Sequence, residues 1–137
     1  MISFDKLTPD PGGMPIYLQI ILYIKHGIVA GVITDGDEMP SRRALSAQLG
    51  INPNTAQKAY RLLEAEGLIL SRRGARSYVS LPPEVLDRVR RELIGHETRD
   101  AVRMFHQMGL TLTEAQEALA IYWNGADEDE HENAVVY

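Results

Sequence analysis

The segment from Gly36 to Ser80 constrains the fold most, because its caps and turns mark two short helices in close succession. Ser41 is a good N-cap, and the helix that it starts, RRALSAQL, ends at Gly50, which can adopt the left-handed conformation. Asn52 caps the next helix, and Pro53 takes its first position, where the N–H would have no intrahelical partner. Two helices joined by a short glycine-containing turn predict a helix-turn-helix.

The second of these helices has two distinct faces. Its apolar residues recur at helical spacing and are expected to pack inward: Ala56, Ala59, Tyr60 and Leu63. The opposite stripe is polar and consists of Asn54, Gln57, Lys58 and Arg61. Asn and Gln can read adenine, Thr55 can meet a thymine methyl group or a phosphate, and the two cations suit phosphates. An ordinary solvated helix face is the alternative, because such stripes are common.

A short hairpin is predicted directly after this helix. Residues 68–70 and 77–81 are apolar or β-prone strands, and RRGAR lies between them with Gly74 as the turn residue. Three arginines are therefore expected at its tip: Arg72, Arg73 and Arg76. Beside a recognition helix, such a hairpin is a wing that can lie along the DNA backbone or in a minor groove.

The charge is concentrated in the same segment. Residues 40–81 carry seven cations and two anions, a net charge of +5 in a chain whose total is −5. Residues 82–137 carry five cations and twelve anions. A basic island in an acidic chain predicts a localised surface for a polyanion, and double-stranded DNA is the expected partner.

The segment from Met14 to Leu81 resembles the GntR family of winged-helix transcriptional regulators. The resemblance rests on PIYLQI, the turn GVITDGDEMPS, the helices RRALSAQLGINPNTAQKAYRLLEAEGLI and the wing RRGARSYV. It implies a DNA contact by Arg43, in the P-S-x-R-x-L block, and base reading by Pro53, Asn54, Thr55 and Gln57. Family wings usually read R-x-G-x-G-x-F/Y-V, and here Arg76 replaces the second glycine. The full predicted DNA-binding set is Ser41, Arg42, Arg43, Asn52, Asn54, Thr55, Gln57, Lys58, Arg61, Arg72, Arg73 and Arg76.

The predicted fold is mainly α-helical with a small β-hairpin. Residues 1–13 form an N-terminal extension, 14–81 the winged helix-turn-helix domain, 82–125 a helical region and 126–137 an acidic tail that is expected to be disordered. In the helical region, one helix is predicted from residue 84 to Ile94, ended by Gly95, and a second over residues 97–108. A third should begin at Thr111, because Thr111 and Glu114 fit a capping box.

These C-terminal helices are too short to bury a core of their own, so their apolar stripes need a partner. A second copy of the chain is the favoured partner, and a two-fold dimer would match a palindromic operator. Packing back onto the DNA-binding domain is the alternative. Within the GntR family, the short C-terminal part resembles the YtrA branch, which implies dimerisation through it and an association with transporter genes.

Other classes of function have less support. The chain has no cysteine, phosphate-cradling glycine loop or paired His–carboxylate motif, so no enzyme activity, cofactor or metal site is predicted. No apolar run approaches the roughly 18 residues of a membrane span, and the N-terminus does not resemble a signal peptide, so we expect a cytoplasmic protein. The remaining rival is a winged helix that only contacts proteins. The prediction is a dimeric DNA-binding regulator, most simply a repressor, with any small-molecule effector unspecified.

Overall fold

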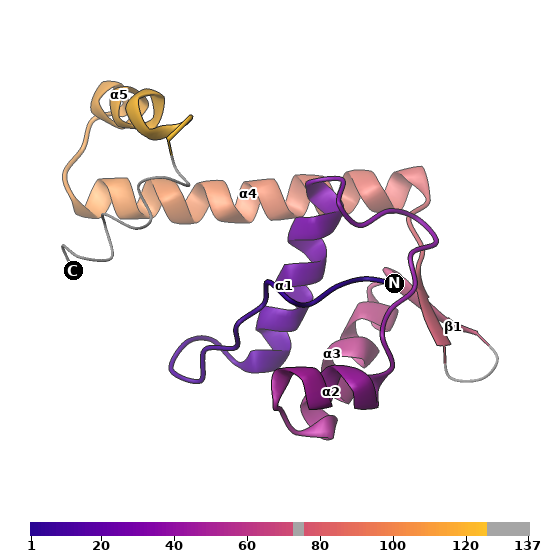
Figure 1. Cartoon of the computed structure of the whole chain (residues 1–137). Coiled ribbons are helices and arrows are strands. Elements are labelled where there is room, and N and C mark those ends of the chain that lie inside the picture. The colour runs from indigo at the N-terminus through magenta and orange to yellow at the C-terminus, as the bar shows by residue number, and fades with distance from the viewer. Residues whose placement is uncertain (73–75, 126–137) are drawn as a thin grey trace. The chain divides into compact units, whose positions relative to one another are not determined.

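The computed structural model describes residues 1–72 and 76–125. The chain divides into two compact units, Met1–Ile94 and Gly95–Tyr137. The predicted boundary at residues 82–83 differs from this division, which falls inside a helix. The elements, shown in Figure 1, are α1 (Ile16–Val29), α2 (Arg42–Leu49), α3 (Pro53–Ala65), β1 (Ile69–Arg72), β2 (Arg76–Val79), α4 (Pro83–Gln107) and α5 (Leu112–Tyr122). A mainly helical fold with one hairpin is therefore confirmed.

The caps read from the sequence set the ends of the two central helices. The Oγ atom of Ser41 accepts a hydrogen bond from the backbone N–H of Ala44 at 3.0 Å. The Oδ1 atom of Asn52 accepts one from the N–H of Asn54 at 2.8 Å, with Pro53 as the first residue of α3. Gly50 ends α2 with a φ of 65°, in the left-handed region. These local signals are sufficient to define the helix-turn-helix.

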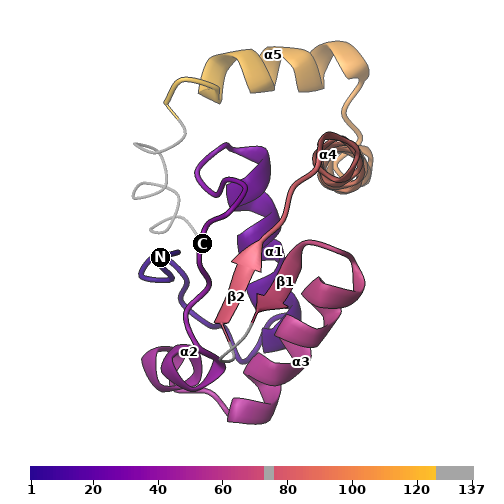
Figure 2. The same ribbon diagram turned by 90° about the vertical axis from the view of Figure 1, so that its right-hand side faces the viewer.

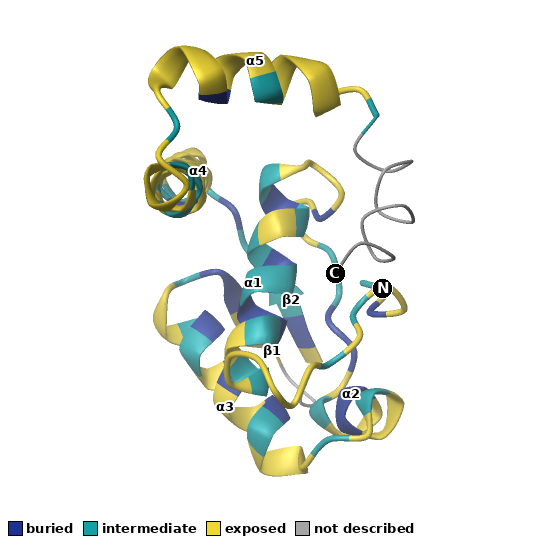
Figure 3. Ribbon diagram, turned by 90° about the vertical axis from the view of Figure 1, so that its left-hand side faces the viewer, coloured by how far each residue is buried: buried dark blue, intermediate teal, exposed yellow. Residues whose placement is uncertain are grey.

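The core of the first unit forms where α3 packs against α1, α2 and β1. The residues that α3 buries are the predicted inward set of Ala56, Ala59, Tyr60 and Leu63. From α1 the buried residues are Ile20, Ile21, Ile24 and Ile28, which recur at helical spacing. Figure 3 shows the buried positions of this unit on the inner faces of these helices, with the exposed positions of α3 on its outer face.

The two strands form an antiparallel hairpin in which Ile69 pairs with Val79 and Arg72 with Arg76. The connection between α1 and α2 runs along β2: the N–H of Val79 donates to the Asp37 carbonyl at 2.8 Å, and that of Met39 to the Ser77 carbonyl at 2.9 Å. Figure 2 shows the hairpin beside α3. The base of the wing is thus held by backbone hydrogen bonds on both edges of β2.

The N-terminal segment belongs to the core of the first unit, which the sequence reasoning did not anticipate. Phe4 is only 1% exposed and stacks on Tyr23 of α1, with ring centroids 5.1 Å apart. The Tyr23 hydroxyl donates to the Ser3 carbonyl at 2.8 Å, and the N–H of Ile2 donates to the Glu38 carbonyl at 2.8 Å. Residues 1–13 therefore contribute packing to the winged-helix unit.

The two helices predicted over residues 84–108 are a single helix, α4, so the predicted break at Gly95 is wrong. Gly95 continues the helix without a positive φ, unlike Gly50 and Gly67. A glycine inside a helix costs only about 1 kcal/mol relative to alanine, and the good helix formers on both sides offset that cost. Gly50 is followed within three residues by the cap Asn52 and by Pro53, whereas no proline follows Gly95 there and its two next residues, His96 and Glu97, are not cap residues.

The second unit is described over residues 95–125. The predicted capping box is confirmed: the N–H of Glu114 donates to Thr111 Oγ1 at 3.2 Å, and the N–H of Thr111 donates to Glu114 Oε1 at 3.1 Å. Ala115 is the one buried residue of α5. No helix in the described ranges is long and apolar enough to cross a membrane. The predicted acidic tail, residues 126–137, lies outside the described residues.

Candidate DNA-binding surface

The predicted base-reading residues lie on the outer side of α3. Asn54 and Gln57 are exposed and Thr55 is half-buried, and the predicted phosphate contact Arg61 is exposed as well. Their spacing places the three exposed side chains on one face of the helix, opposite the buried residues. This face presents amide donors and acceptors together with a guanidinium group, the groups that read base edges in a major groove.

The two N-cap residues in the predicted set already have structural partners. Ser41 and Asn52 each use a side-chain oxygen to cap a helix, as described above. The Ser41 hydroxyl hydrogen and the Asn52 amide group remain as donors. These caps also fix the N-termini of α2 and α3, whose backbone N–H groups favour anions such as phosphate.

The two adjacent arginines of α2 differ in their surroundings. Arg43 is exposed, as its predicted DNA contact requires. Arg42 is directed inward: its Nη2 lies 3.1 Å from Glu64 Oε1, and its guanidinium lies over the Tyr60 ring, 5.0 Å from the centroid. Its side chain is 25% exposed, so Arg42 is less available to DNA than Arg43.

Tyr60 anchors the start of this region from inside the core. Its hydroxyl donates to the Pro40 carbonyl at 2.6 Å, one residue before the N-cap of α2. Burial raises the pKa of Tyr60, and the nearby Arg42 charge only partly opposes that effect. The phenol therefore remains a neutral hydrogen-bond donor across the accessible pH range.

Lys58 lies at the edge of the polar stripe. Its Nζ atom is 4.0 Å from the centroid of the Tyr17 ring, on the first turn of α1. A cation–π contact of this kind is worth roughly 0.5–1 kcal/mol at an exposed site, so a phosphate can draw the ammonium group away from the ring.

The wing presents its arginines beside a carboxylate and a ring. Arg72 lies over Tyr78 at 5.0 Å, and Arg76 Nη1 is 3.8 Å from Glu38 Oε1. A hydrogen bond with Tyr78 and the Glu38 charge raise the pKa of Arg76 further above its ordinary value, so this residue is a permanent cation. The predicted contact by Arg73 falls at the tip, outside the described residues.

The described residues offer no competing metal site. No group of three or more His, Asp or Glu side chains lies close enough together in them to hold an ion. The acidic turn near residue 35 has structural roles instead: Asp35 Oδ1 accepts from the N–H of Leu81 at 2.7 Å, and Asp37 Oδ2 from the N–H of Thr34 at 2.8 Å.

Sequence reasoning did not assign a role to Glu64, which lies among the predicted contacts. Its carboxylate accepts hydrogen bonds from the Arg42 guanidinium of α2 and from the Ser71 hydroxyl of β1. Only its position in the basic island could have indicated a role, since Arg42 lies in another helix and Ser71 lies in the strand after α3.

Comparison with known proteins agrees with this geometry. Residues 16–79 match the family described as bacterial regulatory proteins, gntR family. The chain is 32% identical to the uncharacterized HTH-type transcriptional regulator YhcF of Bacillus subtilis over 81% of its own length and 92% of that protein. It is 41% identical to the HTH-type transcriptional repressor YtrA of Bacillus subtilis over 58% of each chain.

A solved structure matches over a similar extent. The GntR family transcriptional regulator from Listeria monocytogenes aligns with a TM-score of 0.73 and 28% identity, covering 82% of this chain and 97% of that one. The winged helix-turn-helix, the polar recognition helix and these relatives together give the assignment. The chain belongs to the GntR family as a small, YtrA-like DNA-binding transcriptional regulator.

Proposed function

We propose that this regulator is a homodimeric repressor that acts in the cytoplasm on a palindromic operator. The observation that carries the DNA-binding part of the proposal is the exposed polar face of α3, together with exposed Arg43 in α2 and exposed Arg72 and Arg76 in the wing. In this assignment Asn54, Thr55 and Gln57 read base edges, and Lys58 and the exposed arginines contact phosphates or a narrowed minor groove. Repression would follow from occupying DNA that the transcription machinery needs.

Repression and the choice of target genes are proposed from the similarity to YtrA. The relative YtrA is named as a repressor, which supports the same sign here. The resemblance to that branch also supports transporter genes as targets. No effector is proposed.

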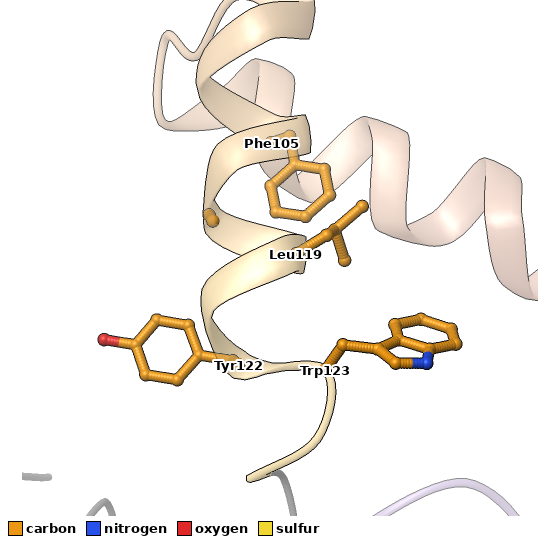
Figure 4. Close-up of a pocket in the computed structure, with 5 residues that line it drawn as sticks. Phe105, Leu119, Tyr122 and Trp123 are labelled. Carbon is orange, nitrogen blue, oxygen red and sulfur yellow. The ribbon is translucent and has the colours of Figure 1, made fainter.

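Dimerisation is supported by the apolar surface of the second unit. A groove of about 450 Å³ is lined by Phe105 of α4 and by Ala118, Leu119, Tyr122 and Trp123 at the end of α5. Figure 4 shows Phe105 and Leu119 close together at this groove, with Tyr122 and Trp123 at the helix end. Trp123 is 74% exposed, and an exposed apolar surface of this kind marks an interaction site.

DNA binding is tested by fluorescence anisotropy on the duplex upstream of the chain's own gene, beside a scrambled duplex, over a salt series. We expect tight binding that prefers the native fragment and weakens steeply with salt. Weak binding that ignores sequence and salt would refute the proposal and favour a protein-contact module.

Dimerisation is tested by light scattering after size exclusion. We expect a dimer for the wild type and a monomer for Trp123→Asp, because a buried carboxylate without a partner is costly. Val32→Asp is the matched control, since Val32 is 79% exposed in a turn of the first unit, outside the proposed dimer surface. A monomeric wild type, or a Trp123→Asp variant that stays dimeric, would contradict the assigned interface.

A further inference from the structure

Glu64, near the C-terminal end of α3, lies where three parts of the DNA-binding surface meet. Its Oε1 atom accepts a hydrogen bond from Arg42 Nη2 at 3.1 Å and another from Ser71 Oγ at 2.5 Å. Arg42 is the first residue of α2, and Ser71 lies in β1. One carboxylate oxygen therefore joins the start of α2 and the wing to the recognition helix.

On the α2 side, Glu64 pairs with the partly buried guanidinium group of Arg42. Arg42 lies over the Tyr60 ring, and its Nε is buried without a hydrogen-bond partner among the described residues. A partly buried guanidinium group needs a nearby anion, because losing one partner leaves an uncompensated charge. Glu64 supplies that anion and so fixes the first turn of α2, from which the neighbouring Arg43 projects.

On the wing side, Glu64 contacts the second-last residue of β1. Ser71 pairs with Ser77 across the hairpin, and their hydroxyl oxygens are 3.5 Å apart. Ser77 is buried, whereas Ser71 and the following Arg72 are exposed. The bond to Glu64 therefore fixes the direction in which β1 leaves the core, one residue before the first arginine of the tip.

We propose that Glu64 is a positioning residue that holds Arg43 and the wing at a fixed distance from the recognition helix, so that all three engage one DNA site. The inference rests on the proposed function. Glu64 does not contact DNA in this assignment, and its negative charge by itself repels phosphate. Its positioning role and its electrostatic effect therefore act on affinity in opposite directions.

Because the two effects change DNA affinity in opposite directions, a charge-removing substitution can distinguish them. Glu64→Gln is the test variant, and Glu66→Gln is its matched control. Both changes remove one carboxylate from the same end of α3, but Glu66 pairs with Lys25 of α1 at 2.9 Å and not with the wing. Electrostatics alone predicts that both variants bind DNA slightly more tightly. We expect Glu66→Gln to do so, and Glu64→Gln to bind the operator about fivefold more weakly, because coupled contacts are lost.

A double-mutant cycle with Arg72→Ala separates positioning from a general loss of stability. In the wild-type background, Arg72→Ala should weaken binding and flatten the dependence on salt. In the Glu64→Gln background it should change little, because the wing is no longer held on the DNA. Ser71→Ala removes only the hydrogen bond to the wing and keeps the Arg42–Glu64 pair. In this background, too, Arg72→Ala should change affinity little. The Ser71→Ala variant therefore provides the test if Glu64→Gln does not fold.

Two results would overturn the inference. One is a Glu64→Gln variant that binds as tightly as Glu66→Gln, and the other is a full Arg72→Ala effect in both the Glu64→Gln and Ser71→Ala backgrounds. These outcomes differ from failure of the proposed function, in which the wild-type chain itself binds no duplex.

Discussion

Replacing Gln57 and Arg72 one at a time separates base reading from phosphate contact. Gln57 is exposed on the polar face of α3, and Arg72 is exposed in the wing. Loss of a base contact costs about 1–3 kcal/mol at each half-site, which is roughly a 5- to 150-fold loss of affinity per contact. We expect Gln57→Ala to show this loss on the operator and almost none on scrambled DNA.

Arg72→Ala should act differently, because a phosphate carries no sequence information. Each phosphate contact contributes about 0.9 to the slope of log affinity against log salt, so a dimer that loses two contacts flattens by about 1.8. Raising the salt concentration from roughly 50 to 200 mM should therefore reduce the ratio of wild-type to Arg72→Ala affinity about 12-fold.

Anisotropy titrations on operator and scrambled duplexes at several salt concentrations measure both effects. Arg90→Ala is the control for the loss of one positive charge, since Arg90 is exposed on α4 outside the proposed surface. The assignment of roles is refuted if the Gln57 and Arg72 variants act identically on the two duplexes.

Two further predictions concern stability and can be measured by urea unfolding at neutral pH. Phe4→Ala should lower the free energy of unfolding by about 3–4 kcal/mol, because it removes a fully buried ring and its stacking on Tyr23, whereas a truly extended N-terminus would show no effect. Gly50→Ala should cost about 1–2 kcal/mol from backbone strain alone, since φ is 65° and an added Cβ would meet no atom within 4 Å; a neutral result would contradict the left-handed turn.

The parts of this fold that were predictable from sequence depend on chemistry within a few residues. Ser41, Asn52 and Thr111 accept hydrogen bonds from N–H groups two or three residues ahead, so a short window contains both partners. The division of α3 into a buried and an exposed face follows from helical spacing in the same way. The proposed DNA-binding surface was inferred from these signals and from the local excess of cations.

The parts that were missed depend on partners distant in sequence or on a balance between weak local effects. Nothing near Phe4 indicates that Tyr23 completes its packing, and nothing near Arg42 indicates that Glu64 turns it inward. Gly95 has the residue type of a helix end but lies in mid-helix, because its small cost is exceeded by its neighbours.

The contacts among charged residues lead to a last prediction, the steepness of the salt dependence. Arg42 pairs with Glu64 and Arg76 with Glu38, whereas Lys58 and Arg72 lie over aromatic rings without an ion pair in the described part of the chain. Four exposed cations of the surface have no ion pair to another described residue: Arg43, Lys58, Arg61 and Arg72.

Four phosphate contacts per subunit give a dimer a log–log slope of about −7, and a fifth contact from Arg73 would make it about −9. If all seven cations of the basic island contacted phosphate, the slope would instead approach about −13. A measured slope steeper than about −10 would therefore show that the Arg42–Glu64 and Arg76–Glu38 ion pairs open on DNA, and that both arginines then bind phosphate.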